Sequence, residues 1–366
     1  MNAAKFSKMF LRFAAVSCVT VAIAFCANLT SLKPGKAELK SAGPLAFGPD
    51  GILFVGDSMG ATITAIDSED RTPGRAGAKV EVKGLNKAIA GMLGTTPDQI
   101  LVNDMAVNPI SKNVYLSVSR GRGPDAVAMI LRVDLAGKIT EVSLSNVKHS
   151  TVSLPDAPAE KEGRSNPRLE TITDMAFVDG KVFIAGLSNE EFSSSLRSIS
   201  FPFEQAAKGS SVEIYHGSHG RFETNSPVRT FVPYNVLGKD YILAAYTCTP
   251  LVKIPVSDLK PGAKVKGTTI AELGNRNRPL DMIIYKKGGQ DYILMANQSR
   301  GVMKMPVNGV DKLTAITAPV PDKQGLSYET IAELKGVAQL DKFDDGNALM
   351  LFDDAGSLDL RTVALP

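Results

Sequence analysis

The sequence predicts an all-β protein, a six-bladed β-propeller of four-stranded antiparallel blades. One pattern of a short strand, a turn and a strongly β-type run recurs six times in the 366 residues. A repeat of about 55 residues falls in the size range of one propeller blade. Near-copies of whole strands also recur, which a pair of β-sandwiches would not explain, so the propeller is favoured over that alternative.

The second strand of each unit is the clearest element. Each is rich in β-branched, aromatic or aliphatic residues and begins at a turn residue. Almost continuous apolar character indicates strands covered on both faces, as in stacked blades. These strands are expected at residues 51–56, 113–118, 181–186, 240–245, 291–296 and 347–352.

The first strand repeats even more closely. Three copies begin with Asp-Met, at residues 104–107, 174–177 and 281–284, and residues 230–232 take the same place in the fourth unit. Each second strand is followed by a hairpin partner, as at residues 129–133 and 301–305. The two strands flanking each second strand are therefore the first and third strands of a blade.

The fourth strand predicts how the ring closes. The sequence Ile-Ala-Glu-Leu occurs at residues 270–273 and 331–334, and Ala-Glu-Leu occurs at residues 37–39. The sixth unit ends with the chain at Pro366 and has no fourth strand of its own. We therefore expect residues 36–41 to complete the last blade, which would leave the ring without an open edge.

Two segments interrupt the β pattern. Residues 85–93 carry apolar side chains at helical spacing and are followed by Gly94, which predicts a short helix. Residues 145–168 are polar and rich in Pro, Glu and Ser, and are expected to form a long loop between the second and third units.

The N-terminal 27 residues have the form of a secretory signal. Lys5, Lys8 and Arg12 precede an uncharged apolar stretch, with cleavage expected after Ala24 or Ala27; the alternative is a short membrane anchor. The predicted organisation is a signal peptide at 1–27, a linker at 28–35 and the propeller at 36–366. This order predicts a periplasmic or secreted protein without a later membrane span.

Charge and cysteine content narrow the function. The chain has 41 basic and 38 acidic residues, and the three basic residues of the signal account for the difference. A neutral chain argues against nucleic acid as a partner, and we expect a monomer. Cys18 and Cys26 lie in the signal, so Cys248 is left as a lone thiol that is buried, a metal ligand or reactive.

Residues 49–58, Pro-Asp-Gly-Ile-Leu-Phe-Val-Gly-Asp-Ser, resemble a strand pair of NHL-like and gluconolactonase (regucalcin)-like six-bladed propellers. The resemblance implies a ligand pocket at the central tunnel. In the gluconolactonase type it also implies a first-blade Glu, before Gly-Pro, that binds a divalent metal. This sequence has Ala42 before Gly43 and Pro44, which argues against that metal site and lactonase chemistry.

The first strands bring three carboxylates to the tunnel. Asp104, Asp174 and Asp281 begin the strands of the second, third and fifth units. Pointing at one axis, they would suit a hard divalent cation such as calcium. The alternative is structural, with each carboxylate accepting backbone N–H groups and joining neighbouring blades.

The loops around the tunnel mouth supply candidate ligand-binding residues. The ends of second strands place Cys248 and Asn297 there. Guanidinium groups suit carboxylates and phosphates, so a positive rim predicts a small anionic ligand. Alternatively the arginines pair with the Asp residues. The arginines of this predicted rim are Arg120, Arg229, Arg278 and Arg300.

The connection into the fourth unit carries a second candidate metal site. His216 and His219 are three residues apart and Glu223 follows. The two histidines, His219 above all, could hold a transition metal together with Glu223, and Cys248 from the same unit could be a further ligand. The alternative is a solvated loop.

No nucleophile elbow, phosphate loop or other catalytic motif occurs. We therefore expect an exported propeller that binds a small anionic ligand or a metal ion at its tunnel mouth. The alternatives are a metal-dependent hydrolase of gluconolactonase type and a protein-interaction scaffold.

Overall fold

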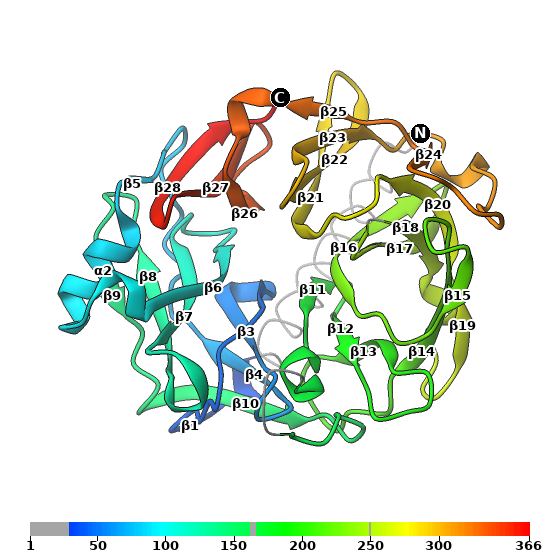
Figure 1. The fold of residues 1–366 in the computed structure, drawn as a ribbon. Coiled ribbons are helices and arrows are strands. Elements are labelled where there is room, and N and C mark those ends of the chain that lie inside the picture. The colour runs from blue at the N-terminus through cyan, green and yellow to red at the C-terminus, as the bar shows by residue number, and fades with distance from the viewer. Residues whose placement is uncertain (1–28, 162–165, 249) are drawn as a thin grey trace, which may run out of the picture.

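A computed structural model describes residues 29–161, 166–248 and 250–366. The predicted signal segment lies outside these residues, together with both of its expected cleavage sites. The described chain forms six sheets around a central axis, which confirms the six-bladed propeller (Figure 1). We number the blades by the chain order of their innermost strands.

Blades 1 to 3 are built as follows. Blade 1 contains β2 (Leu45–Phe47), β3 (Ile52–Asp57), β4 (Thr62–Asp67), β10 (Val147–Ser153) and β1 (Lys33–Gly35). Blade 2 contains β6 (Ile100–Val107), β7 (Val114–Arg120), β8 (Val127–Val133) and β9 (Ile139–Glu141). Blade 3 contains β11 (Asp174–Val178), β12 (Lys181–Leu187), β13 (Ser194–Ser200), β14 (Ser210–His216), β15 (Arg221–Glu223) and, parallel to β14, β19 (Lys264–Lys266).

Blades 4 to 6 follow the same plan. Blade 4 contains β16 (Val228–Val236), β17 (Lys239–Tyr246), β18 (Pro250–Pro255), β20 (Thr268–Leu273) and β24 (Lys323–Gly325). Blade 5 contains β21 (Pro279–Lys287), β22 (Gln290–Asn297), β23 (Gly301–Pro306) and β25 (Glu329–Ile331). Blade 6 contains β26 (Val337–Lys342), β27 (Asn347–Asp354), β28 (Ser357–Ala364) and β5 (Glu81–Val82).

Helical segments are short. The α-helix α2 spans Leu85–Leu93, as predicted, and ends at Gly94, whose φ of 65° suits glycine. Its buried residues include Leu85 and Ile89, and it packs against β28 and β6. The 3₁₀ segments are Pro49–Gly51, Pro97–Gln99, Gly123–Asp125, Pro167–Glu170, Val256–Asp258, Val310–Lys312 and Ala332–Leu334.

The blades do not follow one another in chain order. Contacts between innermost strands run β2–β11–β16–β21–β26–β6 and back to β2. Blade 2 therefore lies between blade 6 and blade 1 (Figure 1). The apolar clusters between blades agree, because Val55 of blade 1 shares a core with Tyr115 of blade 2, and Phe54 shares one with Ile184 of blade 3.

The predicted ring closure is wrong. The outer strand of blade 6 is β5, whose Val82 is the partner of Leu360, and not residues 36–41. Those residues lie against blade 1, because the Asp57 carboxylate accepts the N–H groups of Lys40 at 2.7 Å and Ser41 at 2.9 Å. A segment held there cannot also serve as the edge of blade 6.

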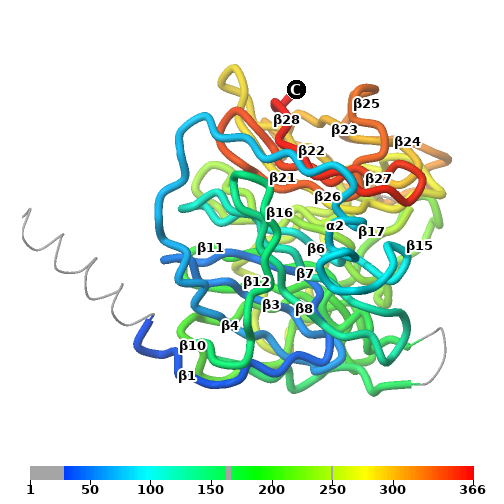
Figure 2. Tube along the Cα trace, turned by 90° about the vertical axis from the view of Figure 1, so that its left-hand side faces the viewer, coloured from blue at the N-terminus to red at the C-terminus, as the bar shows by residue number. Residues whose placement is uncertain are grey.

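Two further expectations are corrected at blade 1. Residues 33–35 of the expected linker form β1, and residues 147–153 of the expected loop form β10. β10 pairs with β4 on one side and with β1 on the other, and Figure 2 shows the three together at one edge of the molecule. The chain thus returns after blade 2 to supply the fourth strand that blade 1 lacks.

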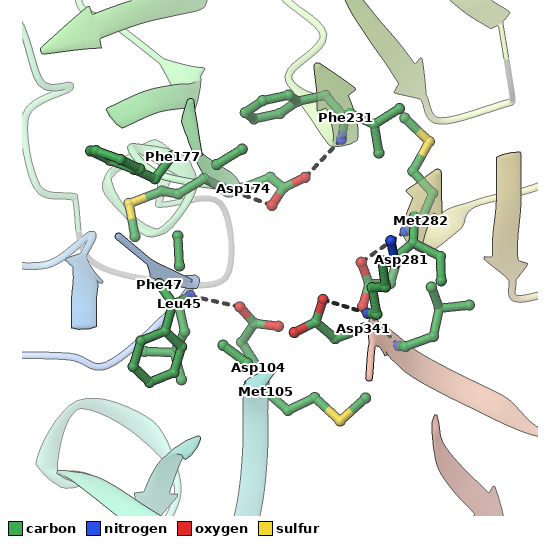
Figure 3. Close-up of a pocket in the computed structure, with 18 of the residues that line it drawn as sticks. Leu45, Phe47, Asp104, Met105, Asp174, Phe177, Phe231, Asp281, Met282 and Asp341 are labelled. Atoms are coloured by element: carbon green, nitrogen blue, oxygen red, sulfur yellow. Dashed lines mark hydrogen bonds between the residues drawn. The ribbon is translucent and has the colours of Figure 1, made fainter. Parts of the chain in front are cut away.

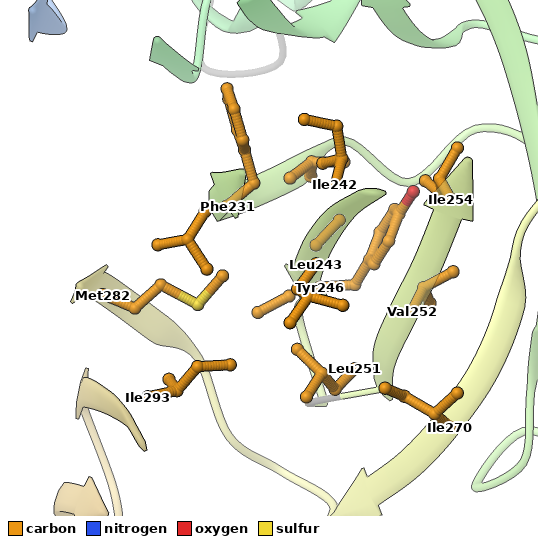
Figure 4. Close-up of a cluster of buried hydrophobic side chains, with 14 of the residues drawn as sticks. Phe231, Ile242, Leu243, Tyr246, Leu251, Val252, Ile254, Ile270, Met282 and Ile293 are labelled. Carbon is orange, nitrogen blue, oxygen red and sulfur yellow. The ribbon is translucent and has the colours of Figure 1, made fainter. Parts of the chain in front are cut away.

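The largest apolar core fills the space around blade 4 (Figure 4). Leu243, Tyr246 and Val252 are at most 1% exposed, and they come from the second and third strands of that blade. Burial on both faces explains why these strands are nearly continuous apolar runs. Among the described residues, no helix has the length and apolar character that crossing a membrane requires.

The blade order can be tested by a disulfide. Glu81 and Arg361 are direct partners across β5 and β28, and such pairs have Cα atoms close enough for a disulfide. With Cys18, Cys26 and Cys248 replaced by serine, we expect Glu81→Cys with Arg361→Cys to cross-link under oxidising conditions. Non-reducing electrophoresis measures the link.

The control for this cross-link is Glu38→Cys with Arg361→Cys in the same background. It represents closure by the N-terminal segment and should give no link. A cross-link in this control and none in the first pair would contradict the observed order.

Candidate functional site

Four carboxylates face a cavity of about 260 Å³ on the propeller axis (Figure 3). Three of them, Asp104, Asp174 and Asp281, are the predicted tunnel residues, and Asp341 of blade 6 joins them. The rest of the lining is largely apolar and includes Met105 and Phe177.

Each carboxylate bonds to the backbone of a neighbouring blade. Asp104 accepts Leu45 N–H at 2.7 Å, and Asp174 accepts Phe231 N–H at 2.7 Å. Asp281 accepts Leu340 N–H at 2.9 Å, and Asp341 accepts Val107 N–H at 2.7 Å. Asp174, Asp281 and Asp341 also accept the N–H of the residue that follows them. This is the structural alternative considered above, in which the carboxylates join the blades.

Burial raises the pKa of all four carboxyls. It raises the pKa of Asp174 to about 7 and that of Asp341 to about 6, against the opposing effect of the N–H bonds. For Asp104 and Asp281, burial and the charges of nearby carboxylates raise the pKa well above the ordinary range. A share of these groups is therefore protonated near neutral pH.

Asp341 was missed because the repeat was aligned on the first residue of each inner strand. At that position blade 6 carries Gln339, whose amide donates to the Asn103 carbonyl at 2.9 Å. Asp341 lies two residues further on, and residues two apart in a strand point to the same face. The alternation of side chains between the two faces of a strand was the signal in the sequence that could have identified Asp341.

The predicted arginine rim forms only in part. Arg229 donates to Glu170 at 2.6 Å and to the Thr247 hydroxyl at 3.1 Å. Burial and the charge of Arg229 lower the pKa of Arg278, which places these two arginines together. Arg300 instead pairs with Asp322 at 3.4 Å, and Arg120 is exposed and makes no ion pair within the described chain.

Asn297 is buried, with an exposed fraction of 3%. Its side-chain oxygen accepts the N–H groups of Ser299 at 3.1 Å and Arg300 at 3.2 Å. The side-chain oxygen therefore shapes its own loop, and the ligand contact predicted for Asn297 stays a prediction.

A second group of side chains that could bind a metal ion lies where blade 3 meets blade 4. His216 ends β14, and His219 lies in the turn that leads to β15. Cys248 comes from the loop between β17 and β18. One ligand atom from each residue lies within 4.8 Å of the others. The three border a cavity of about 480 Å³, so Cys248 lies beside a pocket, though away from the axis.

Glu223 holds both imidazoles. Its carboxylate accepts His216 Nδ1–H at 2.9 Å and His219 Nδ1–H at 2.6 Å, and the two ring centroids are 3.9 Å apart. Burial raises the pKa of Glu223, but these hydrogen bonds outweigh it and lower the pKa to about 2. A carboxylate accepts only, so each ring donates its Nδ1–H, and in a neutral ring Nε2 is left as a free lone pair. Glu223 therefore orients the histidines, where the sequence suggested a metal ligand.

His216 is the most informative member of the group. It is 2% exposed, and burial lowers its pKa, so the ring is neutral at neutral pH. Its Nε2 is buried and has no hydrogen-bond partner among the described residues. Leaving a polar atom buried and unpaired costs about 1–3 kcal/mol, so such an atom in a native structure calls for a partner.

Cys248 has a strained backbone. Its φ of 64° lies in the left-handed region, which costs a residue with a Cβ about 1–2 kcal/mol. The conformation is held by a hydrogen bond from Cys248 N–H to the Asn277 carbonyl at 2.6 Å, from the loop that enters blade 5. Strain of this kind concentrates at functional sites.

Glu272 supports the turn between the two histidines. It is 1% exposed on β20 and accepts the N–H of Gly217, and burial raises its pKa to about 7. A Cβ on Gly217 would lie 3.0 Å from the Glu272 carboxylate and 3.1 Å from Val320, so the turn leaves little room for a side chain there. The sequence hid this role, because Glu272 belongs to the Ile-Ala-Glu-Leu repeat whose other Glu, Glu333, is exposed.

No family model matches the chain, and no curated protein matches its sequence. Among solved structures, a putative oxidoreductase (glucose dehydrogenase) from Thermus thermophilus is 13% identical, with 91% of this chain and 100% of that chain covered and a TM-score of 0.36. The PQQ-bound aldose sugar dehydrogenase of Streptomyces coelicolor is 12% identical, covering 91% and 96%, with a TM-score of 0.32.

A streptogramin B lyase is 10% identical, covering 91% of this chain and 97% of that chain, with a TM-score of 0.32. Likenesses this weak carry no argument about the activity of this chain. The description of the fold rests on its own strand pairing.

The tunnel carboxylates predict a pH dependence of stability. The pKa of Asp174 is about 7 in the folded chain against an ordinary value of 3.8, so its stabilising contribution is complete below about pH 4 and is lost as the pH rises through 7. We expect Asp174→Asn to remove about 1–2 kcal/mol of the decline in unfolding free energy between pH 4 and pH 8. Urea unfolding at several pH values measures it.

Asp354→Asn, at the exposed end of β27, is the control for this experiment and should follow the unmodified protein. A steeper decline in Asp174→Asn than in the unmodified chain would contradict the raised pKa.

Proposed function

We propose that this propeller is an exported metal-binding protein. The ligands are Nε2 of His216, Nε2 of His219 and Sγ of Cys248. The observation that carries the proposal is the buried, unpartnered Nε2 of His216, in a ring whose other nitrogen is already fixed by Glu223. A metal ion would give this atom the partner that no described residue supplies.

The donor set favours a transition metal. Two imidazoles and a thiolate suit zinc or copper ions, whereas calcium takes oxygen ligands. Histidines that bind a metal through one nitrogen usually donate the other N–H to a carboxylate, as both do here to Glu223. Glu272 and Asn277 hold the turn and the cysteine backbone in place.

The tunnel carboxylates support a metal less well. Their oxygens already accept backbone N–H groups of two blades, and their raised pKa values favour the protonated form over the cation-binding form. A hydrolase of gluconolactonase type with a metal at Asp104, Asp174 and Asp281 is therefore the weaker candidate. Periplasmic or secreted location remains part of the proposal and rests on the N-terminal signal pattern.

A small anionic ligand near the rim is a second candidate. It is favoured by Arg278, which lies beside the like charge of Arg229 with Glu170 as their shared carboxylate. An anion there would relieve the repulsion between the two guanidinium groups.

Metal titration tests the proposed centre. After treatment with a chelator, the protein should bind one zinc ion per chain, and His216→Ala or Cys248→Ser should weaken binding more than Glu223→Gln, for which about 10–100-fold is expected. The reason is that the first two variants remove a ligand, whereas the third removes an orienting partner. Calorimetric titration and elemental analysis measure stoichiometry and affinity.

The matched control for this titration is His149→Ala, since His149 lies in β10 of blade 1 and should not affect binding. Circular dichroism confirms that each variant is folded. Absence of binding by the unmodified protein, or equal losses in the His149 and His216 variants, would refute the proposal.

A further inference from the structure

We infer that the metal keeps one exchangeable coordination position, which faces the 480 Å³ cavity and takes a small monoanion such as a carboxylate. This inference rests on the proposed metal centre. It adds the chemical class of the ligand that the centre recognises.

The first step is the count of donors. Zinc sites that are closed have four protein ligands, whereas sites that act on a ligand have three and an open position. The described chain groups three donors here, His216, His219 and Cys248. The nearby carboxylates are engaged elsewhere, Glu223 with the imidazoles and Glu272 with the turn. A fourth ligand would therefore come from outside the protein.

The second step is direction. His216 is 2% exposed and closes one side of the group, whereas the His219 side chain is 42% exposed. The cavity borders all three ligands, so the free position lies on the side that solvent reaches. Cavities of roughly 300–1,000 Å³ hold small molecules, and this one falls in that range.

The third step is the chemistry of the walls. Apart from the three ligands and Phe222, the lining is polar and offers hydroxyl, amide and guanidinium donors, with Glu223 as its one carboxylate. These residues are Arg221, Glu223, Thr224, Asn225, Ser226 and Thr247. Walls rich in donors favour a ligand with acceptor oxygens.

The fourth step is charge. With a divalent ion bound, the Cys248 thiolate and the Glu223 carboxylate together cancel the charge of the ion. Among the residues that line the cavity, Arg221, whose Nε lies 3.4 Å from Glu223, then leaves one excess positive charge. Arg229, which donates to the lining residue Thr247, is already neutralised by Glu170. A monoanion would balance the site, whereas a neutral ligand would not.

The test uses the full chain loaded with Co²⁺, a spectroscopic substitute for zinc. A thiolate-to-cobalt charge-transfer band that is lost in Cys248→Ser reports the metal centre itself. Adding acetate or azide should change the visible d–d bands in a saturable way, because the anion enters the coordination sphere. Acetamide, a neutral analogue of acetate, should leave them unchanged.

Arg221→Gln supplies the charge test. Loss of this exposed cation should weaken acetate binding by about threefold to tenfold with the charge-transfer band intact. Arg75→Gln, on an exposed loop after β4, is the matched control and should bind acetate as the unmodified protein does.

The two proposals fail in distinguishable ways. If cobalt binds through Cys248 but acetate and azide change nothing, or acetamide binds as tightly as acetate, the inference is overturned while the metal centre stands. If cobalt does not bind, the proposed function fails and the inference fails with it.

Discussion

Closure of the ring is the constraint on which the rest of this structure depends. In each blade an outer strand pairs with the third strand, which would otherwise be a long exposed edge with unpaired N–H and C=O groups. Blade 1 and blade 6 each lack a fourth strand that follows their third strand in the chain. After β4 the chain first supplies β5 to blade 6, then forms blade 2, and then supplies β10 to blade 1. This route inserts blade 2 between them. Four tunnel carboxylates then bind the inner strands of adjacent blades to one another.

Carboxylates that accept hydrogen bonds also occur away from the axis, but their donors differ. The buried carboxylates of Asp174 and Glu272 accept hydrogen bonds from backbone N–H groups. A backbone N–H has no second polar atom to offer, so these contacts leave no free ligand atom. Glu223 accepts instead from two imidazoles, and each imidazole has a second nitrogen. One half-buried carboxylate therefore orients two imidazoles beside a thiol held by the next blade. Backbone donors make the first two carboxylates purely structural, whereas imidazole donors make Glu223 part of a candidate metal centre.

Prediction from sequence succeeded where a signal is local. The second strands and α2 follow from apolar runs and helical spacing, which are properties of neighbouring residues. It failed at the N-terminal Ala-Glu-Leu, because three matching residues do not determine which sheet they join, and the carboxylate of Asp57 decided that contact. It also failed at residues 147–153, whose mixed polar sequence forms a strand because β4 and β1 offer it edges on both sides.

The candidate site shows the same division. The amino-acid sequence alone established a β-propeller architecture, Asp residues at the start of three blades and a loop with two histidines and a glutamate. Tertiary structure decided that Asp104, Asp174 and Asp281 join blades, that Asp341 belongs with them, and that Glu223 accepts hydrogen bonds from both histidines. The physical reason is that burial and hydrogen-bond partners set the charge and free lone pairs of a side chain. Both depend on residues from other blades, such as Glu272 and Asn277, that no local pattern specifies.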